Sequence, residues 1–267
     1  GTKISKRLMR KLIELENVWG GYSGQTVLSN VLLPVFENDY IGIIGPNGGG
    51  KTTLIKLILG LIKPTKGLIH SYLQNGETIG YLPQQSHIDR KFPIRVKDIV
   101  VSGLMSHKGI FKRYTSSDTE QAEALLKQMG ILHLRNKTIG EISGGQFQRV
   151  LICRAIISNP KLLILDEPNT FVDNKFEKEL YEALGEFNQR MAIMMITHDV
   201  GTISYFVKTI ACVNNHLHYH PSNIITAEQL ASYNCPIQII THGDVPHTVL
   251  QKHEDGCMSH VHNHQKH

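Results

Sequence analysis

Residues 45–53 of the chain, GPNGGGKTT, fit the spacing G-x-x-x-x-G-K-[ST]. Glycines leave backbone N–H groups unobstructed, so these groups can converge on an anion while the following helix points its positive end at it. Lys51 can reach the outer phosphates of a nucleotide, and the Thr52 hydroxyl can bind Mg²⁺. A glycine-rich turn with a chance lysine is the alternative, but an apolar strand pattern precedes the stretch and a helical pattern follows it. The predicted nucleoside triphosphate site comprises Gly45, Pro46, Asn47, Gly48, Gly49, Gly50, Lys51, Thr52 and Thr53.

The stretch KLLILDE, at 161–167, is an apolar run that ends in two acidic residues. Ligands of open α/β sheets bind beyond the carboxyl ends of the strands, which is where these acids are expected to lie. Asp166 suits Mg²⁺, directly or through water, and the neighbouring Glu167 suits a base for an attacking water. Two solvated acids after a strand are the simpler alternative. The phosphate-binding stretch elsewhere in the chain favours the metal and the base.

The elements that position these groups begin with strands. Alternating apolar residues predict strands at 11–19 and 26–36, and a short apolar run predicts another at 39–45. The helix after the phosphate-binding stretch is expected over 51–61. Residues 67–82 are interpreted as short strands around an Asn-Gly turn.

Helical periodicity dominates the middle of the chain. It covers 95–110 and 117–135, and Ser117 or Asp118 is expected to cap the second helix. From residue 150 onwards helix and strand alternate, which is typical of a doubly wound α/β fold. The sequence therefore predicts such a fold with a helical insertion at about 87–150. One further helix, TAEQLASY, is expected after residue 222, followed by a polar tail.

The composition argues against nucleic-acid binding and against a membrane-spanning chain. The formal net charge of +5 is spread over 267 residues, without the concentrated basic stripe that nucleic-acid binding needs. No cysteine pair has the spacing C-x-x-C, and a reducing compartment is expected. The apolar runs are far shorter than the roughly 20 residues that span a bilayer, so the chain is not expected to cross a membrane. The four cysteines are Cys153, Cys212, Cys235 and Cys257.

Residues 142–149, ISGGQFQR, indicate a family. Alone, Ser-Gly-Gly-Gln could be a helix cap and turn. Between the phosphate-binding stretch and KLLILDE it resembles the L-S-G-G-Q signature of ATP-binding cassette (ABC) proteins, with isoleucine for leucine. The resemblance covers about 11–222 and implies a P-loop ATPase core with an N-terminal antiparallel β subdomain and an inserted helical subdomain. We expect one cassette at 11–222, a C-terminal extension at 223–267 and a solvated basic leader at 1–10.

The resemblance also implies individual roles. Tyr22 matches the aromatic residue that stacks on adenine, although a core role is an alternative. Gln84 matches the glutamine that contacts Mg²⁺ and the attacking water and senses the transport partner. Glu167 resembles the general base, and His198 matches the switch histidine that holds the γ-phosphate. Asp173 matches the last residue of the loop after the catalytic glutamate.

Family resemblance further implies that two cassettes face each other head to tail. Each signature then caps the ATP of the other copy, and a second copy of this chain is the expected partner. Phe171 stands where the family has a small residue near that interface. Gly49 replaces a common serine, which is expected to matter little because the backbone binds the phosphate. The signature residues are Ser143, Gly144, Gly145 and Gln146.

For the attached machinery, the resemblance favours the ATPase subunit of a membrane transporter over a soluble cassette ATPase. The segment from Gln84 to about Gly109 is expected to receive a helix of a separate permease subunit, with Arg95 and Lys97 as the coupling charges. Its F-P-I-x-V pattern, at 92–96, resembles the zinc/manganese importer branch, and iron–siderophore and cobalamin importers are the nearest alternatives. Such a system implies ATP and Mg²⁺, an extracytoplasmic substrate-binding protein, no nucleic acid, and a place on the cytoplasmic face of the cell membrane.

The C-terminal tail is rich in histidine. Ten of the fifteen histidines lie from His216 onward, and the chain closes with CMSHVHNHQKH. Neutral imidazoles and a thiolate suit Zn²⁺, whereas a polar tail that merely tolerates histidine, or a strand edge at HLHYH, is the alternative. The candidate zinc ligands are His253, Cys257, His260, His262 and His264.

Overall fold

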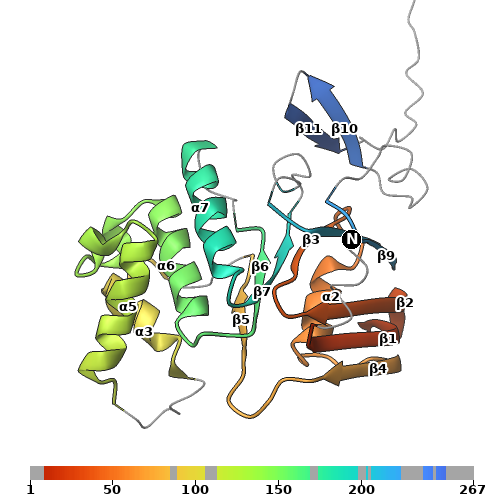
Figure 1. Ribbon diagram of the computed structural model, residues 1–267, viewed down its shortest axis with the longest axis horizontal. Coiled ribbons are helices and arrows are strands. Elements are labelled where there is room, and N and C mark those ends of the chain that lie inside the picture. The colour runs from red at the N-terminus through yellow and green to blue at the C-terminus, as the bar shows by residue number, and fades with distance from the viewer. Residues whose placement is uncertain are drawn as a thin grey trace, which may run out of the picture.

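The computed structural model describes residues 9–84, 89–105, 113–168, 174–197, 203, 206–223, 237–242 and 245–250. A small antiparallel sheet lies on one side of a larger sheet, and most of the helices lie on the other side (Figure 1). This arrangement confirms the predicted α/β fold with a β subdomain and an inserted helical subdomain.

The small sheet has the strand order β2-β1-β4. Val31, Leu33 and Val35, which alternate along β2, are fully buried, whereas Leu32 between them is exposed. The buried face shares one core cluster with Leu54 and Leu57 of the helix α2 (Lys51–Ile58). The period-two pattern of β2 thus places this sheet against the first helix of the α/β core. The strands are β1 (Lys11–Tyr22), β2 (Gln25–Phe36) and β4 (Lys66–Ser71).

The large sheet has the order β5-β6-β7-β3-β8-β9, with β9 antiparallel to β8 and the other neighbours parallel. Every residue of β3, β6 and β7 is buried, which explains their continuous apolar sequences. The carboxyl ends of these parallel strands meet at one edge of the sheet. The strands are β3 (Tyr40–Ile44), β5 (Ile79–Leu82), β6 (Leu162–Asp166), β7 (Ala192–Ile196), β8 (Thr209–Asn214) and β9 (His216–His220).

One strand pairing differs from the prediction. Residues 67–82 do contain two strands, but β4 pairs with β1 and β5 pairs with β6, so they belong to different sheets. The Asn-Gly pair is therefore part of a connection between sheets. Glu77 from this connection bonds Arg10, with Nη2 donating to Oε2 over 2.7 Å. A local turn signal does not reveal such long-range pairing.

The helical insertion contains α3 (Val96–Ser102), α5 (Ser116–Gln128) and the first part of α6 (Gly144–Ile156). The cap of α5 is Thr115 and not Ser117, because the Thr115 side chain accepts from the Asp118 N–H while Asp118 Oδ2 accepts from the Thr115 N–H over 2.6 Å. Asp118 thus acts as the third residue of a capping box. The second predicted helix also stops short of residue 135, with a 3₁₀ turn over Leu132–Leu134.

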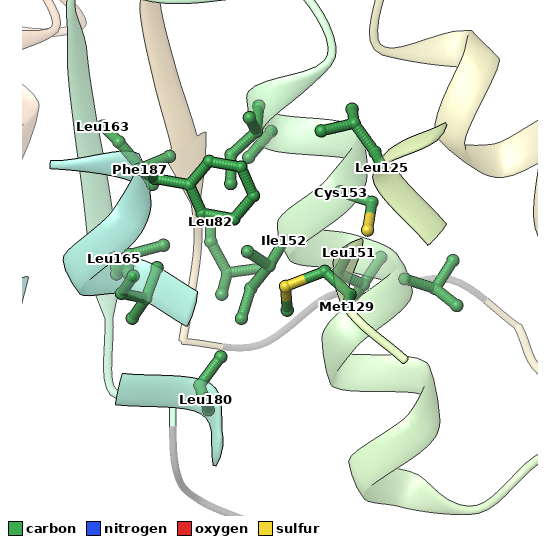
Figure 2. Close-up of a cluster of buried hydrophobic side chains, with 14 of the residues drawn as sticks. Leu82, Leu125, Met129, Leu151, Ile152, Cys153, Leu163, Leu165, Leu180 and Phe187 are labelled. Carbon is green, nitrogen blue, oxygen red and sulfur yellow. The ribbon is translucent and has the colours of Figure 1, made fainter. Parts of the chain in front are cut away.

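The core between the insertion and the large sheet is shown in Figure 2. Phe187 and Leu180 of α7 (Asn174–Phe187) lie beside Leu163 and Leu165 of β6. Ile152 of α6 faces the same cluster. All five are at most 2 % exposed, so α6, α7 and the sheet form one continuous core. This core ties the signature helix to the strand that carries the two acids.

Two further parts of the chain differ from the prediction. The helix α2 (Lys51–Ile58) ends earlier than predicted, and β10 (Ile237–His242) pairs with β11 (Val245–Leu250) where only a polar tail was expected. The predicted helix TAEQLASY lies outside the described residues.

Cys153 and Cys212 are buried free thiols. None of the helices in the described ranges combines the length and apolar character that a membrane span needs.

Candidate functional site

The glycine-rich loop runs from the end of β3 to the start of α2, as predicted. Gly50 is the N-cap of α2, with φ 104°, and its carbonyl accepts the first helical hydrogen bond from Leu54 over 2.9 Å. A Cβ at Gly50 would lie 2.5 Å from Leu28 Cδ2, so both the backbone conformation and the packing require glycine. The loop is therefore a close-fitting backbone cradle at a helix N-terminus, the geometry that binds anions.

Lys51, the first residue of α2, follows this loop and is 8 % exposed. Its Nζ donates to the carbonyl oxygens of Gly45 and Pro46, each over 2.8 Å. These bonds hold the positive charge of the side chain against the carbonyl oxygens at the start of the loop. Lys51 also lines the cleft described next, so its cation is available to an anion bound there.

A cleft of about 380 Å³ opens above the loop. It brings together the loop, the two acids and Gln84, which the sequence places far apart. Its lining residues are Val27, Asn47, Gly48, Gly50, Lys51, Thr52, Thr53, Gln84, Asp166 and Glu167.

The two acids occupy the end of β6. Burial, followed by repulsion from Glu167, raises the pKa of Asp166 from 3.8 to about 6, and the nearby Lys51 only partly offsets this rise. Glu167 has φ 51°, an uncommon conformation for a residue with a side chain, and its N–H donates to Ile196 of β7 over 3.0 Å. The bond to β7 holds the strained residue in place, a pattern frequent at functional sites.

Gln84 and Glu167 meet in the cleft. Gln84 Nε2 donates to Glu167 Oε2 over 2.6 Å. The contact follows from strand register, because Leu82 of β5 pairs with Leu165 of β6 and each polar residue comes two positions later. The resemblance anticipated both residues but not the contact.

The cleft fits a magnesium ion. Thr52, Gln84 and Asp166 all line it, and each offers an oxygen atom, the donor type that Mg²⁺ prefers. The raised pKa of Asp166 reflects a carboxylate that burial and a like charge disfavour. A divalent cation would relieve both penalties.

The signature residues are not part of the described cleft lining. Ser143 caps α6, with its Oγ accepting from Gln146 N over 3.2 Å and Gln146 Oε1 accepting from Ser143 N over 3.0 Å. Neither residue, nor Gly144 or Gly145, is among those that line the described cleft. The capping box gives this helix a regular N-terminus, which lies outside the described cleft lining.

Tyr22 lies at the β1–β2 hairpin and is 41 % exposed, which excludes the alternative core role. Lys56 of α2 places its Nζ 5.2 Å from the centre of the Tyr22 ring. The ring is not part of the described cleft lining.

His198 and Asp173 lie outside the described residues, as do Phe171 and the five candidate zinc ligands of the tail. Within the described ranges no three His, Cys, Asp or Glu residues form a metal-binding group.

Gly49 is packed more closely than the sequence indicated. A Cβ at this position would lie 2.7 Å from the Val213 carbonyl oxygen and 3.1 Å from Pro46. A serine therefore requires the loop or the end of β8 to shift. The loop binds through its backbone, but the space beneath it also matters.

Sequence reasoning missed Val27, which lines the cleft from β2. It also missed Asn215, which contacts the loop from the β8–β9 turn. The Asn-Asn pair between two apolar strands was a turn signal that could have drawn attention to Asn215.

Comparison with known proteins agrees with this geometry. Residues 28–170 match the family described as ABC transporter. The chain is 38 % identical over 223 residues to a probable metal transport system ATP-binding protein of Thermotoga maritima, covering 82 % of this chain and 89 % of that one. It is also 38 % identical to the zinc uptake system ATP-binding protein ZurA of Listeria monocytogenes, covering 78 % and 85 % of the two chains. The chain therefore belongs to the ABC transporter family, as an ATP-binding and ATP-hydrolysing subunit.

Solved structures give the same architecture. An inward-facing ABC transporter described as of metal-chelate type aligns with a TM-score of 0.78 at 28 % identity, over 90 % of this chain and 96 % of the matched chain. A dimeric cassette bound to ADP and phosphate aligns with a TM-score of 0.68 at 24 % identity, over 80 % of this chain and all of the other. The second match shows the fold alone.

Proposed function

We propose that this chain is the ATPase subunit of an importer for a divalent transition metal, zinc or manganese. The cleft that joins the phosphate loop, Asp166, Glu167 and Gln84 carries the ATPase part of the proposal. The metal part rests on relatives named for metal and zinc uptake, among them the high-affinity zinc uptake protein ZnuC of Bacillus subtilis, 38 % identical over 74 % of this chain. The F-P-I-x-V segment supports the same branch.

A metal-chelate importer is the second candidate. It is favoured by the transporter of metal-chelate type that aligns at a TM-score of 0.78. Iron–siderophore and cobalamin systems belong to this class. The cassette itself does not contact the transported solute, so the two candidates differ in their permease and not in this chain's cleft.

In the proposed mechanism the loop N–H groups and Lys51 bind the phosphates of ATP. Thr52, Asp166 and Gln84 would hold Mg²⁺, which neutralises phosphate charge when bound. Glu167 accepts a proton from the attacking water. Gln84 Nε2 donates to Glu167 Oε2 over 2.6 Å and so orients this carboxylate in the cleft.

The capped start of α6 supports a head-to-tail dimer. Ser143, Gly144, Gly145 and Gln146 present a helix N-terminus that does not line the chain's own cleft. Bound ATP then lies between the cleft of one copy and the signature of the other. His198 would hold the γ-phosphate, Asp173 would lie near the dimer interface, and Tyr22 would stack on adenine.

A separate apolar groove, of about 350 Å³, supports docking to a permease subunit. It is lined by Phe92, Ile94 and Ile99 together with Asp89, Ser102 and Arg154. Phe92 is 61 % exposed, as expected for a ring that awaits a partner helix. Arg95 and Lys97 are not among the lining residues, so the groove itself is the better target for coupling variants.

Arg90 links the groove region to the signature. Its guanidinium donates to the carbonyls of Ile139 and Ile142. Ile142 directly precedes Ser143. The guanidinium also lies 5.5 Å from the centre of the Phe147 ring. Movement of the docking segment would thus reach the residues that contact ATP. The proposed assembly places the chain on the cytoplasmic face of the cell membrane, with permease subunits and an extracytoplasmic binding protein.

Zinc binding by the C-terminal tail stays a separate, weaker part of the proposal, carried by its histidine content alone. Calorimetric titration of Zn²⁺ into the full chain and into a chain ending at Asp255 tests it. Identical isotherms would reject a tail site.

The proposed function predicts metal-dependent ATPase activity in the complete transporter. The complex of this chain with its permease, in lipid nanodiscs, should hydrolyse ATP faster when the metal-loaded binding protein is added. Zinc and manganese should stimulate, whereas a ferric siderophore and cobalamin should not. Stimulation by a chelate alone would favour the second candidate.

A further inference from the structure

The turn between β8 and β9 touches the phosphate loop through Asn215. The Asn215 N–H donates to the Gly49 carbonyl over 2.9 Å. The Asn215 side chain donates from Nδ2 to the Val27 carbonyl over 3.1 Å, and the Asn215 carbonyl accepts from Ser29 N over 2.7 Å. One residue therefore joins the loop to two points of β2.

Backbone conformation makes this three-way contact possible. Asn215 has φ 57°, in the left-handed region that asparagine and glycine tolerate best. This conformation turns its N–H and carbonyl towards different segments. Val213, two residues earlier, places its carbonyl oxygen where side chains at Gly45 and Gly49 would lie. The loop thus rests directly on the end of β8.

The contact to Gly49 orients a phosphate-binding group. The Gly49 carbonyl and the Gly50 N–H belong to one planar trans peptide and point in opposite directions. Since Asn215 fixes the carbonyl, the Gly50 N–H is directed away from the turn, and Gly50 lines the cleft. Val27, held by the Asn215 side chain, forms the β2 wall of the same cleft.

We propose that Asn215 is a positioning residue of the nucleotide site, which fixes the phosphate loop relative to the β2 wall. Asn215 itself is exposed, so it adds little to the core and acts through these hydrogen bonds. The proposal rests on the nucleotide site and is independent of the transported solute.

Replacement of Asn215 with glycine tests the role. Asn215→Gly keeps the left-handed backbone and removes only the side-chain amide. Loss of one such hydrogen bond should weaken ADP binding about threefold to tenfold, measured by calorimetry on the full chain. Asn159→Gly is the matched control, because Asn159 has φ 51° and lies outside the cleft lining. The control should bind ADP like the parent chain.

A purely structural role predicts a different result. Both glycine variants would then lower the melting temperature and leave ADP affinity unchanged, which would overturn the proposal. Lys51→Ala shows separately whether the loop is the nucleotide site, since that variant must weaken ADP binding whatever Asn215 does.

If Asn215→Gly does not fold, amide hydrogen exchange of the parent chain decides. The Asn215 and Gly50 amides should exchange more slowly with ADP bound. Unchanged exchange at Asn215 under saturating ADP would also overturn the proposal.

Discussion

Gln84 and Glu167 lie 83 residues apart in sequence, yet Gln84 Nε2 donates to Glu167 Oε2 over 2.6 Å. The bond joins the residue that follows β5 by two positions to the proposed catalytic base. It exists because β5 and β6 are neighbours in the sheet and end in register. A displacement of Gln84 would therefore act directly on the Glu167 carboxylate.

Glu167→Gln should retain ATP binding and lose turnover. The amide keeps the shape of the side chain but cannot accept a proton from water, so hydrolysis should fall by about 10² to 10⁴-fold. Because ATP then persists, the variant should elute as a dimer in size-exclusion chromatography with Mg-ATP. A monomeric elution together with normal turnover would contradict the assigned base.

Lys51→Ala should weaken nucleotide binding itself. The lost charge-assisted hydrogen bonds are worth roughly 1.5–3 kcal/mol, which corresponds to a tenfold to 150-fold higher Kd for ADP. Loss of the bonds to Gly45 and Pro46 should also loosen the loop. Lys63→Ala, an exposed lysine just after α2, is the control and should leave the Kd unchanged. Calorimetry measures both, and equal affinities would exclude the loop as the site.

Asp166→Asn should stabilise the chain when neither metal nor nucleotide is present. The folded-state pKa of Asp166 is raised from 3.8 to about 6, so the folded chain binds more protons than the unfolded chain between these values. Stability therefore falls as pH rises through this window. Above it, the ionised carboxyl costs roughly 2–3 kcal/mol, which the amide does not.

Urea unfolding in EDTA measures this effect. The stability of Asp166→Asn should exceed that of the parent chain at pH 7.5, and the difference should shrink towards pH 4. Glu120→Gln, at an exposed position of α5, should show no such trend. A pH-independent difference would mean that burial and Glu167 do not penalise the Asp166 charge.

Arg90→Lys should uncouple hydrolysis from the permease. Lysine keeps the charge but lacks the planar fork that reaches two carbonyls and covers the Phe147 ring. The ratio of permease-stimulated to basal ATPase rate should fall, with a smaller change in the basal rate. Lys91→Arg, at the adjacent exposed position, should keep the ratio. Equal losses of both rates in Arg90→Lys would indicate misfolding instead of coupling.

Short-range patterns predicted much of the nucleotide site. The loop from Gly45 to Thr53 was recognisable because a strand, glycines and a helix follow each other directly. Asp166 and Glu167 were recognisable because a buried parallel strand has a continuous apolar sequence. These signals are local, and local backbone geometry decides them.

Long-range pairing was not predictable from the same signals. The separation of β4 and β5 into two sheets depends on partners that lie far away in sequence. The contact between Asn215 and Gly49 likewise joins residues from opposite ends of the cassette, and the crowding at Gly49 comes from the Val213 carbonyl. Every residue has a backbone carbonyl, so no sequence pattern can predict which carbonyl will crowd Gly49.

Metal uptake by the reconstituted transporter tests the central claim most directly. Proteoliposomes that contain this chain, its permease and the binding protein should accumulate radioactive zinc or manganese only with Mg-ATP on the side of this chain. The same vesicles with Glu167→Gln should accumulate none. ATP-driven uptake of a ferric siderophore or cobalamin, with no accumulation of either metal ion, would contradict the proposed function.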